Sequence, residues 1–319
     1  MKQFQNLFYF LVAISVVPVV PLSFCNVAEY CLENGAPKVM FDSNQGYFRV
    51  YAVKDDNLAN SLWVNMDEGG QIYFSNITKP AYDSMFEPTN RYAMLPTLSF
   101  DFPYYGTIIR SLKLDIDGRI CMGKMGFPDD DCVSNIAPLG TKLFFPGDNS
   151  YIKYLDTGKS FTVQWGNVDF YPPFYVFEQN ASFQVTLYED GTVQLVYKQM
   201  MTSVFDVVND NFISDVTIGM RDSFKLEAGR NNVDVKPYGV IELKNLLSPD
   251  FGIDSGTVIT MKPLPICNMF TSHESCERSR KLAKCLWCPR LARCFNYGSS
   301  SDFKYWWKTE CSDSPYYIG

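Results

Sequence analysis

The chain has 319 residues, of which 46% are hydrophobic and 16% aromatic, so it can bury a sizeable core and is not a disordered polypeptide. Its net charge of −7 gives no electrostatic footprint for nucleic acid or for anionic lipid, because both require clustered Lys and Arg. We therefore expect no nucleic-acid partner.

Residues 1–25 are predicted to form a signal peptide that is cleaved on export. Lys2 supplies the positive start, and the apolar run that follows is too short and too interrupted by proline to span a membrane. The small residues Ser23 and Cys25 suit cleavage after Cys25. A bacterial lipoprotein box is the alternative interpretation, but the bulky Phe24 stands where such a box has a small residue. We therefore expect the mature chain in an oxidising, extracellular compartment.

The N-terminal segment 26–39 contains one further cysteine, Cys31. If cleavage follows Cys25, Cys31 has no evident partner, and an odd cysteine in an exported protein indicates either a free thiol or an intermolecular bridge. We therefore predict a disulfide-linked homodimer through Cys31. The alternative is cleavage before Cys25, which would let Cys25 and Cys31 close a small local loop.

Residues 40–263 are predicted to form a mainly β domain, an antiparallel β-sandwich, because short strands alternate with turn signals. An Asp-Gly pair between two alternating runs is the strongest short-range hairpin signal, since glycine adopts positive φ without steric cost. Hairpins are predicted at 112–122 around Asp117-Gly118 and at 182–197 around Asp190-Gly191, and further strands at 161–165, 215–219 and 256–261.

Three stretches of this region carry residue types found in binding sites, and each has a second interpretation. Asp115 and Asp117 begin like a calcium loop, but Gly118 comes two positions early, so a hairpin turn is favoured. The acidic run 129–131 is either a calcium-binding loop or, more commonly, a solvated acidic loop. The aromatic run 171–177 is either an exposed contact loop or, more commonly, a cap on the core.

Covalent features are expected at four positions of the same region. Cys121 and Cys132 are its only cysteines, and a bond between them would close a loop of about a dozen residues, so they are predicted to pair. The sequons that begin at Asn76 and Asn180 predict N-linked glycans in an exported protein.

Residues 266–312 are predicted to form a separate cysteine-rich domain, followed by a tail at 313–319. A segment of this size cannot bury enough apolar surface to fold unaided, so we expect disulfides among its six cysteines. Six cysteines allow 15 pairings, and spacing alone does not select one. Zinc bound near His273 is the alternative, because Cys285 and Cys288 have two residues between them, the spacing of a metal knuckle. A helix is predicted at 277–286. The six cysteines are Cys267, Cys276, Cys285, Cys288, Cys294 and Cys311.

Catalytic and cofactor motifs are nearly absent from the sequence. The chain has one histidine, His273, so a serine or cysteine nucleophile paired with a histidine base is excluded for the larger domain. No phosphate-binding glycine loop and no metalloprotease helix occur. We therefore expect no enzymatic activity and no cofactor. A secreted glycoside hydrolase that uses two carboxylates is the alternative that the sequence leaves open.

The ordered series of motifs along the chain resembles the plexin domain-containing proteins, also called the tumour endothelial marker seven family. The C-terminal segment, with Cys285-Leu-Trp-Cys288 and Cys294, resembles their PSI (plexin, semaphorin, integrin) module, a plexin repeat. The other motifs are Ser-Leu-Trp-Val-Asn at 61–65, Leu-Ser-Phe-Asp-Phe-Pro-Tyr-Tyr-Gly at 98–106, Val-Gln-Trp at 163–165, Phe-Gln-Val-Thr-Leu at 183–187 with Asp190-Gly191, and Met-Lys-Pro-Leu-Pro-Ile-Cys at 261–267.

This resemblance implies a receptor-like protein that binds secreted or matrix proteins. Members of the family continue into a transmembrane helix, whereas this sequence ends at Gly319 with no apolar run of about 20 residues beyond the leader. We therefore expect a secreted protein, or a single-pass cell-surface protein if the chain is C-terminally truncated. A structural component of the extracellular matrix is the alternative function, and it would need more than one binding surface.

Overall fold

The computed structural model describes most of the chain beyond residue 38, and all of the described residues belong to one compact unit, Lys38–Gly319. No helix among them is long and apolar enough to cross a membrane. The described residues are 39–44, 47–75, 92–94, 97–105, 107–115, 117–123, 132, 134–141, 145–169, 180–209, 216–227, 233–247, 252–264, 267–283, 285–296 and 311.

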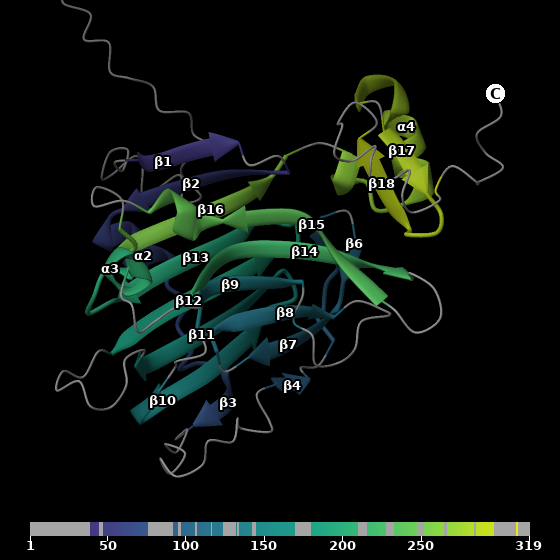
Figure 1. Ribbon diagram of the computed structural model, residues 1–319. Coiled ribbons are helices and arrows are strands. Elements are labelled where there is room, and N and C mark those ends of the chain that lie inside the picture. Colours follow the sequence, from purple (N-terminus) through teal and green to yellow (C-terminus); the bar gives the residue numbers. More distant parts are fainter. Residues whose placement is uncertain are drawn as a thin grey trace, which may run out of the picture. The chain divides into compact units, whose positions relative to one another are not determined.

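Two antiparallel sheets lie one over the other, as Figure 1 shows. The larger sheet has the strand order β1-β2-β16-β13-β12-β11-β10-β3, and the smaller has the order β15-β14-β9-β8-β7-β4. The strands of the larger sheet are β1 (Val39–Asn44), β2 (Phe48–Lys54), β16 (Thr257–Pro263), β13 (Val193–Gln199), β12 (Ala181–Tyr188), β11 (Ser160–Asp169), β10 (Phe145–Asp156) and β3 (Gln71–Ser75). Those of the smaller sheet are β15 (Val233–Glu242), β14 (Thr217–Glu227), β9 (Asn135–Gly140), β8 (Arg119–Gly123), β7 (Ser111–Asp115) and β4 (Tyr92–Met94).

Both predicted hairpins are present. In the first, Gly118 has a φ of 80° between β7 and β8. In the second, Gly191 has a φ of 85° between β12 and β13, and its amide donates to the carbonyl of Tyr188 at 2.9 Å. A Cβ atom added at Gly191 would lie 3.0 Å from Cγ of Pro103, so steric space as well as φ favours glycine there.

A hydrophobic core fills the space between the sheets, which confirms the predicted β-sandwich. Trp165 of β11 and Phe183 of β12 stack with ring centroids 5.6 Å apart, and both side chains are fully buried. Nε1 of Trp165 donates to the carbonyl of Asp115 on β7 at 3.3 Å, and the hydroxyl of Tyr197 on β13 donates to the carbonyl of Pro138 on β9. These hydrogen bonds join the larger sheet to the smaller one across the core.

The outer face of the larger sheet is also covered, although its polar side chains are of the type found at a solvent-facing surface. Helix α2 (Asp56–Leu62) begins at Asp55, whose side chain accepts from the amide of Leu58, and it packs against β13 and β16. After the helix, the amide and carbonyl of Val64 exchange hydrogen bonds of 2.9 and 2.8 Å with the side chain of Gln184. The alternating pattern of β12 therefore marks two buried faces and not one buried and one exposed face.

The cysteine-rich residues form a helix and a two-stranded sheet. The elements are η3 (Cys267–Met269), α4 (His273–Ala283), β17 (Cys285–Cys288) and β18 (Arg293–Asn296). The predicted helix at 277–286 lies about three residues too far along the chain, because Cys285 and Leu286 pair with β18 in the small sheet. Short elements elsewhere are β5 (Phe102–Tyr104), β6 (Thr107–Ile109), α3 (Val204–Asn209) and η2 (Leu243–Leu246).

Candidate functional site

All eight cysteines in the described part of the chain form disulfides, and they pair within the groups that the sequence predicts. Cys121 bonds to Cys132, and the six C-terminal cysteines bond among themselves. The C-terminal pairs are Cys267–Cys285, Cys276–Cys294 and Cys288–Cys311, with Cα atoms 5.3, 5.7 and 5.2 Å apart. One of the 15 pairings that spacing left open is thus selected.

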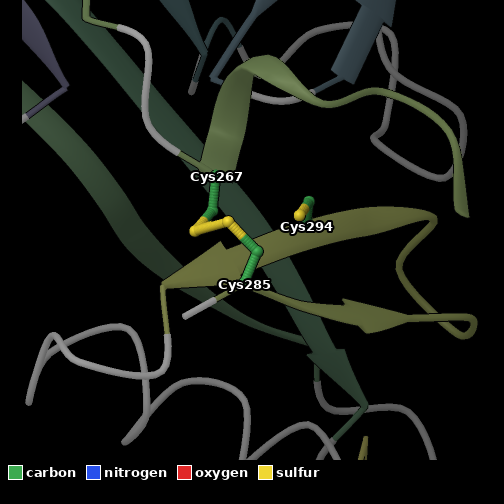
Figure 2. Close-up of side chains that lie close together, drawn as sticks. All are labelled: Cys267, Cys285 and Cys294. Atoms are coloured by element: carbon green, nitrogen blue, oxygen red, sulfur yellow. A yellow bond between two sulfur atoms is a disulfide. The ribbon is translucent and has the colours of Figure 1, made fainter. Parts of the chain in front are cut away.

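These bonds also decide between disulfides and zinc. The sulfur atoms of Cys267, Cys285 and Cys294 lie within 4.8 Å of one another in a buried cluster, which is close enough for a shared ion. Figure 2 shows that Cys267 and Cys285 are bonded to each other, and the sulfur of Cys294 is bonded to that of Cys276. Because zinc requires thiolates, this cluster is a disulfide core and not a metal centre.

The Asp-Gly turn between β7 and β8 is closed by an ion pair. Asp115 is fully buried, and its carboxylate accepts from the amide of Asp117 at 3.0 Å and from the guanidinium of Arg119 at 2.6 Å. Arg119 also lies 3.7 Å from the carboxylate of Asp117. The two carboxylates are directed to backbone and guanidinium donors, which is the geometry of the hairpin turn that the sequence favours.

A second buried ion pair joins the cysteine-rich residues to the sandwich. Nη2 of Arg293, on β18, lies 2.8 Å from the Asp222 carboxylate on β14 and donates to the Thr107 hydroxyl on β6, also at 2.8 Å. The hydroxyl of Ser134 donates to the other Asp222 oxygen at 3.2 Å. The side chains of Asp222 and Arg293 are 0% and 5% exposed, so water screens this pair very little. We call these four residues the junction cluster.

Tyr104 extends the junction cluster into the core. Its hydroxyl lies 2.8 Å from the carbonyl of Arg221 and 2.9 Å from that of Asn135, so its proton links β14 to β9. Burial raises the pKa of Tyr104 well above the usual tyrosine value, and the nearby Tyr105 and Asp222 raise it further. Tyr104 therefore keeps its proton and donates at neutral pH.

The strands β3 to β15, which supply most of the sandwich, coincide with a match to a known family. The family model described as NIDO related matches residues 73–238 of the chain. The chain belongs to the NIDO-related family. No solved structure matches the chain. The NIDO-related match and the disulfides together indicate an extracellular domain.

The NIDO-related match includes Asp222 but ends before Arg293, so the junction cluster joins the family domain to the cysteine-rich residues beyond it. The match does not reach residues 267–311, and the resemblance of those residues to a PSI module stays a prediction. Sequence spacing gave no signal for this cluster, because its two charges lie 71 residues apart.

The buried carboxylates in the described part of the NIDO-related protein are Asp115, Asp117 and Asp222, and an arginine lies within 3.7 Å of each. Each of these three carboxylates is therefore paired with a guanidinium inside the fold. The histidine, His273, lies at the start of α4 with its ring centroid 6.1 Å from that of Trp287.

The remaining predicted sites divide into one that the structure describes and several that it does not. Asn180 lies immediately before β12 and is half-buried. The leader, Cys31, Asn76, the acidic run 129–131 and the aromatic run 171–177 lie outside the described residues. One exposed contact was not predicted: Nζ of Lys198 lies 5.0 Å from the ring centroid of Trp63, a cation–π geometry on the outer face of the larger sheet.

Proposed function

We propose that this NIDO-related protein is a receptor-like binding protein, secreted or held at the cell surface, that recognises a secreted or matrix protein, and that it is not an enzyme. The observation that carries the proposal is the junction cluster. A buried ion pair between Arg293 and Asp222 holds the cysteine-rich residues against the sandwich, so the two can present one fixed surface to a ligand. A fixed surface loses little conformational entropy on binding, which favours affinity.

The covalent framework supports the same proposal. Four disulfides hold the described chain together, and such a framework persists in an oxidising compartment. The proposal includes cleavage of the leader after Cys25, glycans on Asn76 and Asn180, and a PSI module at 266–312. Intact-mass analysis of protein from a secretory host tests the first two, because a chain that retains Met1 or lacks glycosidase-sensitive mass would contradict them.

Binding is tested with a matrix preparation, since the ligand is defined only by its class. Labelled, disulfide-bonded protein is titrated onto surfaces coated with solubilised basement-membrane extract or with proteins from conditioned medium. We expect saturable binding that is lost when the protein is reduced and alkylated, because the framework then no longer holds the surface. Absence of saturable binding to both preparations would contradict the proposal.

The same preparations test for catalysis. Incubation of the protein with matrix polysaccharides should release no new reducing ends over a blank. If reducing ends are still released after further purification of the protein, and substitution of one of its carboxylates abolishes their release, the protein is an enzyme. The stoichiometry of the saturable complex then separates a ligand-binding module, which needs one surface, from a matrix component, which needs at least two.

A further inference from the structure

The sequon at Asn180 stands at the beginning of β12, an inner strand of the larger sheet. Asn180 lies immediately before β12, whereas Ala181 and Ser182 are the first two residues of that strand. Ala181 is fully buried, and Ser182 is 9% exposed. Two of the three sequon residues are therefore part of the folded core.

Both neighbouring strands hold these two residues in place. β12 lies between β11 and β13, with Ala181 opposite Val168 on one side and Ser182 opposite Gln199 on the other. β11 bulges at this position, and the amide of Asn167 in the bulge donates to the hydroxyl of Ser182 at 3.1 Å. The hydroxyl of Ser182 thus has a structural role in the folded sheet.

N-glycosylation needs the same hydroxyl. The side-chain amide nitrogen of the asparagine attacks the anomeric carbon of a lipid diphosphate-linked oligosaccharide, which is the co-reactant. The bond from that carbon to the diphosphate oxygen breaks, the lipid diphosphate leaves with the bonding electrons, and the amide loses one proton. The transferase recognises the acceptor through the hydroxyl two residues after the asparagine, so Ser182 must be free to enter its site.

We propose that Asn180 is glycosylated only before β12 is incorporated into the sheet, so that its occupancy reports how fast β11, β12 and β13 assemble. This inference rests on the export that the proposed function includes. The three strands lie within residues 160–199 and pair in chain order, so they need no later segment to close over the sequon. Transfer and folding therefore compete for Ser182 during synthesis, and a mixture of occupied and unoccupied chains is expected.

The test compares folded and unfolded acceptors with purified oligosaccharyltransferase and lipid-linked oligosaccharide. Unglycosylated, disulfide-bonded protein is one acceptor, and the other is the same protein reduced and alkylated in denaturant and shown by circular dichroism to have lost its strands after the denaturant is removed. Peptide mass spectrometry should show modification of Asn180 in the unfolded chain at least about tenfold faster, because β12 must leave the sheet to expose Ser182 in the folded one.

A matched control places a sequon outside the strands. Met201→Asn creates one that ends at Ser203, in the link between β13 and α3, where Met201 is 61% exposed. The Ser203 hydroxyl accepts from the amide of Phe205 at 3.3 Å, so only the first turn of α3, and no strand, must open to release it. The unfolded protein should therefore be modified faster than the folded protein by a much smaller factor at this site than at Asn180. Equal rates at Asn180 in the two acceptors would overturn the inference. Modification of the control but not of Asn180 in the unfolded chain would also overturn it.

A cellular arm tests the competition itself. Gly191→Ala slows closure of the β12–β13 turn, because its φ of 85° is unfavourable for alanine, and leaves the sequon unchanged. Occupancy of Asn180 in total intracellular protein should rise in this variant, and an unchanged or lower occupancy would contradict the proposal. The purified assay does not depend on export, so its failure would leave the proposed function standing.

Discussion

Replacement of Arg293 by methionine should lower the free energy of unfolding by about 3–5 kcal/mol, the usual cost of removing one partner from a buried ion pair. The Asp222 carboxylate is 0% exposed. In the variant it would keep the hydrogen bond from the Ser134 hydroxyl but lose the positive charge of Arg293. Most of the loss is therefore the cost of leaving a buried carboxylate without that charge. Guanidinium unfolding with intact disulfides measures the effect.

The double variant Arg293→Met with Asp222→Asn separates this cost from a loss of packing. It removes both charges and keeps the acceptor for Ser134, so it should be more stable than Arg293→Met alone, which gives a positive coupling energy. Lys54→Met is the control, because its ion pair with Asp254 is 47% and 31% exposed and should contribute only about 0–1 kcal/mol. If Arg293→Met costs no more than Lys54→Met, the junction cluster does not hold the two parts together.

Three further predictions concern single features of the sandwich. Replacement of both Cys121 and Cys132 by serine should cost about 3 kcal/mol by loop-closure entropy, measured as the fall in the free energy of unfolding extrapolated from urea titrations. Gly191→Ala should destabilise by about 1 kcal/mol more than Gly158→Ala, because both have positive φ but a Cβ at Gly158 meets nothing within 4 Å. Burial alone would raise the pKa of Asp156. Hydrogen bonds from the hydroxyl and amide of Ser99 and from the amide of Gly158 outweigh this effect, so the pKa is lowered. Its contribution to stability is thus complete above pH ~4 and is lost as the pH falls through the lowered value, which thermal melts of wild type and Asp156→Asn at pH 6 and pH 3 would show.

The hairpins were predictable from the sequence because local chemistry decides them. An Asp-Gly pair between two alternating runs specifies a tight turn, and the alternation then determines which side chains share a face. Phe183, Val185 and Leu187 lie on one face of β12 as predicted, and Val193, Leu195 and Tyr197 on one face of β13. The pairing of Cys121 with Cys132 followed from their number and nearness alone.

The covering of the outer face was not predictable in the same way. Gln164, Gln184 and Gln194 alternate with apolar residues and have the polarity of a solvent-facing surface, yet each is at most 5% exposed. Gln184 exchanges hydrogen bonds with Val64, 120 residues earlier in the chain, and it also donates to Gln164. The side-chain oxygen of Gln194 accepts from the hydroxyl of Tyr188. Binary pattern identifies a polar face, but only the tertiary fold decides whether water or protein covers it.

The junction cluster shows the same limit for charged residues. Neither Asp222 nor Arg293 has a local signature, and each alone would be far too costly to bury. Their burial is tolerable only as a pair, with Thr107 and Ser134 as further hydrogen-bond partners. The sandwich and the cysteine-rich residues therefore do not have independent surfaces at this position: each supplies the charge that the other needs. A fragment that ends before β18 leaves the carboxylate of Asp222 without its guanidinium, and it also loses Phe295 from the core and the Cys276–Cys294 and Cys288–Cys311 disulfides. We therefore expect such a fragment to be less stable than the full chain by more than the ~3–5 kcal/mol of the ion pair.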